Sequence, residues 1–224
     1  MTEKESVWED PERVEEFATR EADTRMLELI KRFDTPAAAR VLDLGCAAGR
    51  NTVVLAALGF DAYAVDSSAA MIERTRVRVA EAVGEEEAKR RVAQGCMDDL
   101  SRFDDASFDM IVGVGVYHNA HDRAEWERSL AESSRILRDD GLLLVANFSP
   151  RCDPDGQGMQ PVEGEPGVYI GFGRERLFLL EQDALDADMR RHGFEPEVET
   201  VTVTREVEKG ARVVVNALYR KIAS

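Results

Sequence analysis

The sequence of 224 residues predicts an α/β fold: a single doubly wound, mostly parallel sheet with helices on both faces. Short β-rich runs alternate with stretches of helical periodicity, which is typical of βαβ units. The runs are almost wholly apolar, as in strands that are buried on both faces. Two β-rich runs near the end of the chain form a hairpin pattern, which predicts an antiparallel strand at the end of the sheet.

The elements follow from this alternation. Helical spacing of apolar residues between 11 and 33 predicts an N-terminal helix, with Asp10 as its cap and Pro11 in its first turn. Asp122 is expected to cap a later helix. The predicted strands span residues 40–45, 61–66, 91–95, 109–115 and 141–148, and the predicted helices between them span 51–58, 68–83 and 122–137.

The pattern changes after residue 148. Residues 149–173 are rich in Gly and Pro without apolar periodicity, so we expect a long loop that contains no strand or helix. A loop of this length inside a compact domain is usually functional, and we expect it to be a mobile lid. A helix over 175–192, closed by Gly193, and a hairpin turning at residues 208–210 are expected to follow.

Charge and composition exclude several classes of protein. The chain has 29 Lys and Arg against 44 Asp and Glu, and this net charge of −15 repels nucleic acids and anionic membranes. No apolar stretch is long enough for a membrane span, and the acidic N-terminus does not resemble a secretory signal, so we expect a cytoplasmic location. Three scattered cysteines indicate neither a disulfide framework nor a zinc site.

The sharpest motif lies in residues 41–51, where a buried strand ends in a turn of small residues that opens a helix. Such a turn lets a ligand approach the backbone and directs the N–H groups of the helix start toward it. A nicotinamide fingerprint fails here, because Ala47 and Arg50 stand where its second and third glycines belong. The spacing from Gly45 through Ala47 to Gly49 fits the shorter turn D/E-x-G-x-G-x-G instead.

At this turn the sequence resembles the class I S-adenosylmethionine-dependent methyltransferases, and the resemblance continues in consistent order from about residue 38 to 148. It implies a Rossmann-like sheet of seven strands whose seventh strand is antiparallel. It also implies that Asp66, at the end of the second strand, binds both ribose hydroxyls of the cofactor, although Asp66 could simply cap the next helix. Met71 would pack near the adenine or belong to the core.

The sequence departs from this family at two positions. Ala47 replaces the middle glycine of the turn, and its methyl group is tolerable only if φ stays negative. Cys96 stands where an aspartate is usual, so a hydrogen bond to the adenine must come from Asp98, from backbone or not at all. Met97 can still cover the base, and Gly113 would offer its carbonyl to the amino group of the cofactor.

Candidate catalytic residues follow the fourth strand. His118 could act as a general base, because an ordinary histidine pKa of ~6.5 allows it to accept a proton at neutral pH, but it could equally pack beside the cofactor. Tyr117 is a second candidate. His118 and His121 lack a third ligand at a recognisable spacing, so we expect no metal. The aromatic candidates for a substrate cage, which could equally be core residues, are Trp8, Phe17, Tyr117, Tyr169 and Phe172.

The resemblance implies methyl transfer from S-adenosylmethionine to an unidentified small molecule by in-line displacement, in a monomer or homodimer. A non-catalytic module that binds S-adenosylmethionine or S-adenosylhomocysteine is the alternative, because of the changes at Ala47 and Cys96. We expect one domain with an N-terminal helical cap (1–35), a cofactor-binding core (36–148), the lid-like loop (149–173) and a C-terminal helix and hairpin (174–224). The expected cofactor-binding residues are Asp43, Gly45, Cys46, Ala47, Gly49, Asn51, Asp66, Ser67, Met71, Met97, Asp98, Gly113, Val114 and His118.

Overall fold

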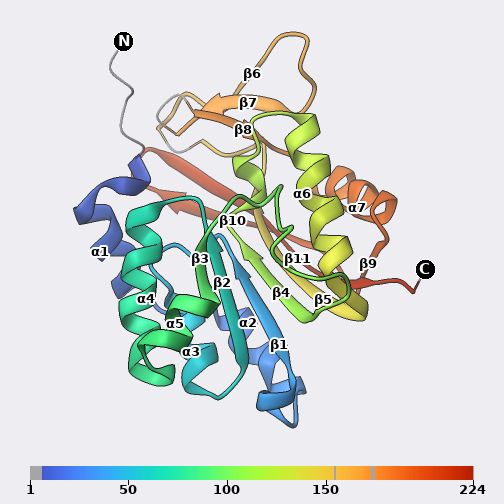
Figure 1. Ribbon diagram of the computed structural model, residues 1–224. Coiled ribbons are helices and arrows are strands. Elements are labelled where there is room, and N and C mark those ends of the chain that lie inside the picture. The colour runs from blue at the N-terminus through green and yellow to red at the C-terminus, as the bar shows by residue number, and fades with distance from the viewer. Residues whose placement is uncertain (1–6, 154, 173–174, 224) are drawn as a thin grey trace. The chain divides into compact units, whose positions relative to one another are not determined.

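The computed structural model describes residues 7–153, 155–172 and 175–223, so parts of the predicted N-terminal cap and of the lid-like loop lie outside the described residues. The chain forms two compact units, and we describe each by itself. Figure 1 labels their helices and strands. The first unit is Met1–Met97 with Phe108–Val112, and the second is Asp98–Ser107 with Gly113–Ser224. The prediction of one domain stays a prediction.

The first unit is built on parallel strands. β1 pairs with β2 and with β4, and β2 pairs with β3, all in parallel register. Nearly every residue of β1, β2 and β4 is buried, as their apolar sequences predict for strands covered on both faces. The strands are β1 (Arg40–Leu44), β2 (Asp61–Asp66), β3 (Val92–Gln94) and β4 (Phe108–Val114).

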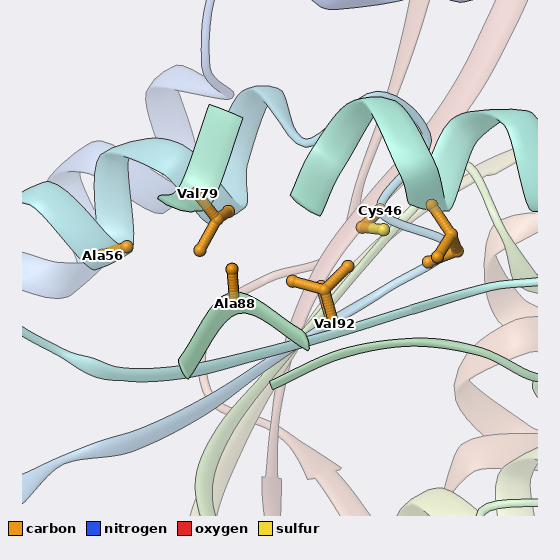
Figure 2. Packing of buried hydrophobic residues seen from close by; sticks show 7 residues of the cluster. Cys46, Ala56, Val79, Ala88 and Val92 are labelled. Atoms are coloured by element: carbon orange, nitrogen blue, oxygen red, sulfur yellow. The ribbon is translucent and has the colours of Figure 1, made fainter. Parts of the chain in front are cut away.

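Three helices pack on these strands: α3 (Arg50–Ala57), α4 (Ala69–Val83) and α5 (Glu85–Arg91). Their apolar side chains form a buried cluster in which Val79 of α4 and Ala88 of α5 lie near Val92 of β3 (Figure 2). The helices before and after β2 are confirmed. α5 was not predicted, although its three glutamates in the first turn and its basic last turn match the helix dipole.

The prediction of one N-terminal helix over 11–33 is wrong. The segment contains η1 (Val7–Glu9), α1 (Pro11–Thr19), α2 (Thr24–Leu29), η2 (Ile30–Arg32) and η3 (Pro36–Ala38). Asp23 interrupts the pattern, because its carboxylate accepts hydrogen bonds from the N–H groups of Arg25 and Met26 and so starts a new helix. Asp10 caps α1 in the same way, as predicted.

The second unit is built on antiparallel strands. β11 pairs antiparallel with β5, β10 and β9, which confirms the predicted hairpin. Asp122 caps α6, as predicted. The elements are η4 (Tyr117–Asn119), α6 (Arg123–Ile136), β5 (Leu137–Phe148), α7 (Gln182–Arg191), β9 (Phe194–Pro196), β10 (Val201–Val207) and β11 (Gly210–Lys221).

Residues 149–173 are not a loop without strands. β6 (Gln160–Pro161), β7 (Val168–Gly171) and β8 (Glu175–Phe178) form a small antiparallel sheet. The predicted helix over 175–192 is therefore wrong at its start, since α7 begins only at Gln182. These strands are two to four residues long, too short for periodicity to appear between the glycines and prolines. Gly193 follows α7 with φ +80°, as predicted.

The strand order in the larger sheet is β10-β11-β5-β4-β1-β2-β3, with β9 beside β11. The pairs among β1 to β4 are parallel, and those that involve β11 are antiparallel. The predicted fold class, a mostly parallel sheet of about seven strands with an antiparallel C-terminal hairpin, is confirmed.

Candidate functional site

The turn after β1 takes an unusual backbone path. Gly45, Ala47 and Gly49 have φ values of +67°, +47° and +79°, all in the left-handed region. The condition stated for Ala47, a negative φ, is not met, so its backbone is held in a conformation that costs an L-residue about 1–2 kcal/mol. Gly49 is required for a second reason, because a Cβ there would lie 2.7 Å from Thr75 Cγ2.

The amides of this turn are bound within the protein. Gly45 N and Cys46 N both donate to the carbonyl oxygen of Val65, at 2.8 and 3.1 Å. Ala47 N donates to Asp66 Oδ2 at 2.8 Å, and Gly49 N donates to Cys46 O at 2.9 Å. These four amides are therefore not free to bind a ligand, and the expectation that the N–H groups at the start of α3 face one stays a prediction.

Helix α4 holds the carbonyl groups of the same turn. Thr75 Oγ1 donates to Ala47 O at 2.7 Å, and an Arg78 guanidinium nitrogen donates to Ala48 O at 2.5 Å. Neither residue was predicted, because nothing in the sequence links a helix to a turn that lies almost thirty residues earlier. The hydrogen bonds from the turn to β2, together with those from α4 to the turn, hold the turn in one conformation.

Asp66 stands at the end of β2, half-buried beside the exposed Ser67. Its Oδ1 accepts a hydrogen bond from Ser68 N at 2.9 Å, and its Oδ2 accepts the one from Ala47. Ser68, not Asp66, caps α4, since Ser68 Oγ accepts from Met71 N at 3.1 Å. A carboxylate has about four acceptor positions, so two remain for the hydroxyl groups of a ribose. Burial raises the pKa of Asp66.

The N-terminal segment closes over the start of α4. Glu9 accepts hydrogen bonds from Ala69 N and Ala70 N at 3.0 and 3.1 Å, and Ser68 Oγ donates to Trp8 O at 2.9 Å. The negative charge of Glu9 also contributes to the raised pKa of Asp66. Sequence reasoning missed Glu9, because its partners lie about sixty residues away in the chain.

Two predicted cofactor residues support the junction between the turn and α3. Asp43 is 2% exposed, and its Oδ2 accepts a hydrogen bond from Thr52 Oγ1 at 2.6 Å. Burial raises the pKa of Asp43 to about 6. Asn51 is also buried, and its Oδ1 accepts from Asp23 N at 2.9 Å. Both side chains serve the scaffold that shapes the turn.

The side chains of Cys46 and Met71 belong to the core. Cys46 is a buried member of the cluster in Figure 2, and burial raises the pKa of its thiol. Met71 is fully buried against Val14 and Ala18 of α1 and against Ala48. The structure favours the core alternative for Met71. The side chain of Cys46 is likewise part of the core, so a contact of Cys46 with a ligand would involve its backbone.

The predicted adenine-side residues fall at the end of the first unit and the start of the second. Met97 is buried, and Cys96 is exposed and in no disulfide. Asp98 Oδ2 accepts two hydrogen bonds from the guanidinium of Arg128, at 2.8 and 3.1 Å. One carboxylate oxygen of Asp98 is therefore committed to an ion pair.

In the second unit, Gly113 and Tyr117 pack against each other. A Cβ on Gly113 would lie 2.4 Å from Tyr117 Cε2, so the tyrosine ring itself requires a glycine. Tyr117 is 0% exposed, and its hydroxyl lies 2.7 Å from Ser133 Oγ. Burial also raises the pKa of Tyr117. The interpretation of Tyr117 as a catalytic or substrate-cage residue is wrong, since its hydroxyl is bonded inside the core. Val114 ends β4 half-buried.

His118 is 5% exposed, and burial lowers its pKa to about 4. Its Nδ1 lies 3.4 Å from Phe148 N and accepts that hydrogen bond. In a neutral ring with an acceptor at Nδ1, the proton is on Nε2. Burial and the bond from Phe148 N favour the packing alternative for His118, and its role as a general base stays a prediction. His121 Nδ1 lies 2.9 Å from Glu125 Oε2.

The aromatic candidates separate into two groups. Trp8 and Phe17 form an edge-to-face pair in the first unit, with ring centroids 5.5 Å apart. Phe172 stacks on Phe148 in the second unit, with centroids 4.6 Å and planes 15° apart. The ring of His118 lies 4.4 Å from that of Phe148, which sequence reasoning did not select. Tyr169 packs half-buried in the same cluster as the Phe148 and Phe172 rings.

Comparison with known proteins shows the family of this chain. The family described as "Methyltransferase domain" matches residues 15–199. The chain is 31% identical over 160 residues to methyltransferase GfsG of Streptomyces halstedii, an alignment that covers 70% of this chain and 54% of that protein. The chain thus spans about half the length of the curated relatives it matches.

Solved structures share the fold. The CcbJ methyltransferase of Streptomyces caelestis has a TM-score of 0.66 at 20% identity, with 99% of this chain and 100% of that chain covered. The 1,6-didemethyltoxoflavin-N1-methyltransferase of Burkholderia thailandensis, solved with its substrate and S-adenosylhomocysteine, has a TM-score of 0.64 at 23% identity and covers 97% of this chain and 82% of that chain. The chain belongs to the class I S-adenosylmethionine-dependent methyltransferases.

Proposed function

We propose that this methyltransferase domain transfers the methyl group of S-adenosylmethionine to a small-molecule acceptor. The observation that carries the proposal is the left-handed turn at Gly45–Gly49, which is bonded to the Asp66 carboxylate at the end of the neighbouring strand. The cofactor, when bound, supplies a methyl group on a sulfonium leaving group. The chain has to bind it, orient the acceptor and exclude water.

The residues of this chain divide these tasks. Asp66 has acceptor positions left for the ribose hydroxyls, and Gly45 has φ +67°, a backbone conformation that favours glycine. By family resemblance the carbonyl of Gly113 receives the amino group, and Met97 covers the adenine. Asp43, Asn51 and Thr75 do not contact the cofactor in this proposal. Their hydrogen bonds hold the turn that binds it.

The acceptor supplies its own nucleophile in this proposal. His118 Nδ1 is bonded to backbone and the Tyr117 hydroxyl is buried, so neither predicted catalytic residue takes a proton. An acceptor that reacts as a neutral ring nitrogen, a phenolate or a thiolate needs no general base at neutral pH. A rate that stays constant from pH 7 to 9 with a neutral nitrogen acceptor supports this, and a sigmoidal rise contradicts it.

Two experiments test the proposed function. Calorimetry should show binding of S-adenosylmethionine and S-adenosylhomocysteine but not of NAD. A release assay for S-adenosylhomocysteine across a panel of small nucleophiles should then identify acceptors. Tight cofactor binding with no turnover on any acceptor would favour the regulatory binding module, and absence of cofactor binding would refute both functions.

No helix in the described part of the chain is long and apolar enough to cross a membrane. We propose that the protein works in the cytoplasm, since its net charge of −15 disfavours association with anionic membranes. We propose that it is a monomer or homodimer. We also propose that the segment 149–173 covers the acceptor. Light scattering coupled to gel filtration distinguishes monomer from dimer, and a larger assembly would contradict the proposal.

A further inference from the structure

The strand β10 (Val201–Val207) is an edge of the larger sheet. It pairs with β11 and ends the strand order that the described residues define. In an antiparallel pair, alternate residues direct their N–H and C=O groups away from the neighbouring strand, so β10 offers backbone groups to another molecule. Edge strands are commonly protected by lysine, proline or a bulge. β10 contains neither lysine nor proline, and its register with β11 is unbroken.

The two faces of β10 differ. Val201 is 51% exposed and Val203 is 47% exposed, and alternate residues of a strand share a face, so these valines lie side by side on one face. On the other face, Thr202 Oγ1 donates to Gln182 Oε1 of α7 at 2.9 Å. Helix α7 thus covers one face at the start of β10, and the other face leaves two valines in water.

The charged residues at the two ends of this apolar strip are unpaired. Glu199 and Arg205 are exposed, and neither has an ion pair or a side-chain hydrogen bond with a residue in the described part of the chain. Arg205 also stands directly opposite Arg212 of β11. Like charges in opposite positions destabilise a strand pair. A carboxylate on the free side of β10 would therefore stabilise this hairpin.

Residues 199–205 have a self-complementary sequence, Glu-Thr-Val-Thr-Val-Thr-Arg. We consider a second copy that runs antiparallel along the edge, with the two-fold axis at Thr202. The opposing residues are then Glu199 with Arg205, Thr200 with Thr204, Val201 with Val203, and Thr202 with itself. Opposite charges, apolar pairs and Thr–Thr pairs are cross-strand combinations that stabilise antiparallel strands.

Neighbouring registers lose this match. With the axis at Val203, each Arg205 faces Val201, and with the axis at Thr204 it faces Val203. With the axis at Arg205 itself, two arginines face each other, which is destabilising. Among these registers, the axis at Thr202 alone gives each Arg205 a carboxylate directly opposite.

A hollow of about 530 Å³ borders residues 199–202, where the second half of the other strand would lie. The charged side chains that line it are Arg151, Glu181, Asp183 and Glu199. Arg151 is already paired with Glu181, at 3.1 Å. The hollow therefore has an excess of negative charge, which complements the Arg205 guanidinium of a second copy.

We propose that two copies of this chain associate through β10, which continues the larger sheet across a two-fold axis at Thr202. A single strand pair makes a smaller interface than that of a permanent dimer, so we expect a dissociation constant of about 1–100 µM. The interface uses none of the residues assigned to the cofactor, so this inference goes beyond the proposed function and does not depend on it.

Charge reversal tests the proposed ion pairs. Sedimentation equilibrium of the full chain over about 1–500 µM should show a monomer–dimer equilibrium. Arg205→Glu places two carboxylates opposite each other and Glu199→Arg places two guanidinium groups there, so each should raise the dissociation constant at least about tenfold. The double variant restores both pairs in reversed order and should return to within about threefold of wild type.

The same variants separate local pairing from general repulsion. Arg205→Glu makes the acidic chain more negative and Glu199→Arg makes it less negative, so repulsion alone predicts opposite effects on dimerisation. Glu163→Arg, on the exposed turn between β6 and β7, matches the charge change of Glu199→Arg and should not weaken the dimer. Opposite effects of the two β10-edge variants would overturn the proposal.

A cysteine at the axis tests the register. Opposing residues of antiparallel strands have Cα atoms about 4.5–5.5 Å apart, a separation that a disulfide spans. Thr202→Cys should therefore crosslink two chains under mild oxidation. Thr204→Cys should not, because its two copies would lie about 14 Å apart, four residues at about 3.4 Å each. Both variants carry Cys96→Ser, since Cys96 is exposed.

The outcomes decide between this dimer and other uses of the edge. A wild-type chain that stays monomeric over the whole concentration range would overturn the proposal and leave the edge to a different partner. Preferential crosslinking of Thr204→Cys would overturn it too, because the strands would then pair in another register. Circular dichroism checks the folding of each variant, and the cysteine pair decides the matter if a charge variant does not fold.

Discussion

The turn after β1 and the end of β5 differ in how their polar groups are hydrogen-bonded. In the turn, amides donate to Val65 and Asp66, and carbonyls accept from Thr75 and Arg78. At the end of β5, the buried Asn147 side chain lies against His118, whose Nδ1 accepts a hydrogen bond of 3.4 Å from Phe148 N. The turn is held by several short hydrogen bonds, whereas the end of β5 is held mainly by the contacts among the rings of His118, Phe148 and Phe172.

A turn that is bonded before its ligand arrives loses little entropy on binding, so it suits a cofactor whose shape never changes. The turn after β1 therefore suits a ligand of fixed shape.

Gly49→Ala should break the turn and have the largest effect. It combines a left-handed φ with a Cβ only 2.7 Å from Thr75, so we expect a loss of about 3–4 kcal/mol in the free energy of unfolding. Urea denaturation measures it. Gly59→Ala is the matched control, since Gly59 has φ +86° but no atom within 4 Å of a Cβ, and it should lose only about 1 kcal/mol. Equal losses would mean that Thr75 does not constrain the turn.

The two regions should also respond oppositely to pH. The raised pKa of Asp43, about 6, means that the folded state holds its proton more tightly, so stability falls as pH rises from about 4 to 6. The lowered pKa of His118, about 4, means that the unfolded state binds the proton more tightly, so stability rises with pH from about 4 to 6.5. Each contribution is about 3 kcal/mol.

Variants separate these opposing contributions. Relative to wild type, Asp43→Asn should gain stability between pH 4 and 7, and His118→Gln should lose it, in urea denaturation series at several pH values. Parallel pH curves for wild type and Asp43→Asn would mean that Asp43 is ionised inside the protein at little cost. Parallel curves for wild type and His118→Gln would mean that His118 titrates normally.

Asp66→Ala should weaken the first region as a binding site while the fold persists. Loss of the hydrogen bonds from the ribose hydroxyls to a charged acceptor should reduce the affinity for S-adenosylhomocysteine by about 1–3 kcal/mol. Calorimetry measures this, with circular dichroism to confirm folding. Unchanged affinity in a folded variant would limit Asp66 to its observed bonds with Ala47 N and Ser68 N.

Ala47→Gly should have the smallest effect and the opposite sign. Glycine relieves the strain at φ +47°, and the entropy that it adds to the unfolded chain offsets part of that gain, so we expect a stabilisation of about 0.5–1 kcal/mol. Thermal unfolding measures it. A destabilised variant would show that the contacts of the Ala47 methyl group with the cluster around Met71 outweigh the backbone strain.

The failures of sequence reasoning are physical and specific. The strands β6 to β8 are too short for a period to appear, and the break before α2 depends on one capping residue, Asp23. Ala47 has a positive φ although alanine rarely adopts one. Its N–H donates to Asp66 and its carbonyl accepts from Thr75, and these two bonds hold it in place. His118 and Tyr117 seemed reactive as residue types, but burial and backbone contacts decide which atoms of them are available.

The sequence by itself determined the fold class, the order of most strands, the turn at Gly45–Gly49 and the position of Asp66, because these depend on local periodicity and on spacing along the chain. Only the tertiary structure decided that Thr75 and Arg78 hold the turn after β1, that Glu9 bonds the start of α4, and that His118 is buried against Phe148. Such contacts join residues that lie far apart in the chain. The burial of a side chain, which sets its pKa and its free hydrogen-bonding atoms, depends on these contacts and cannot be predicted from the residue type.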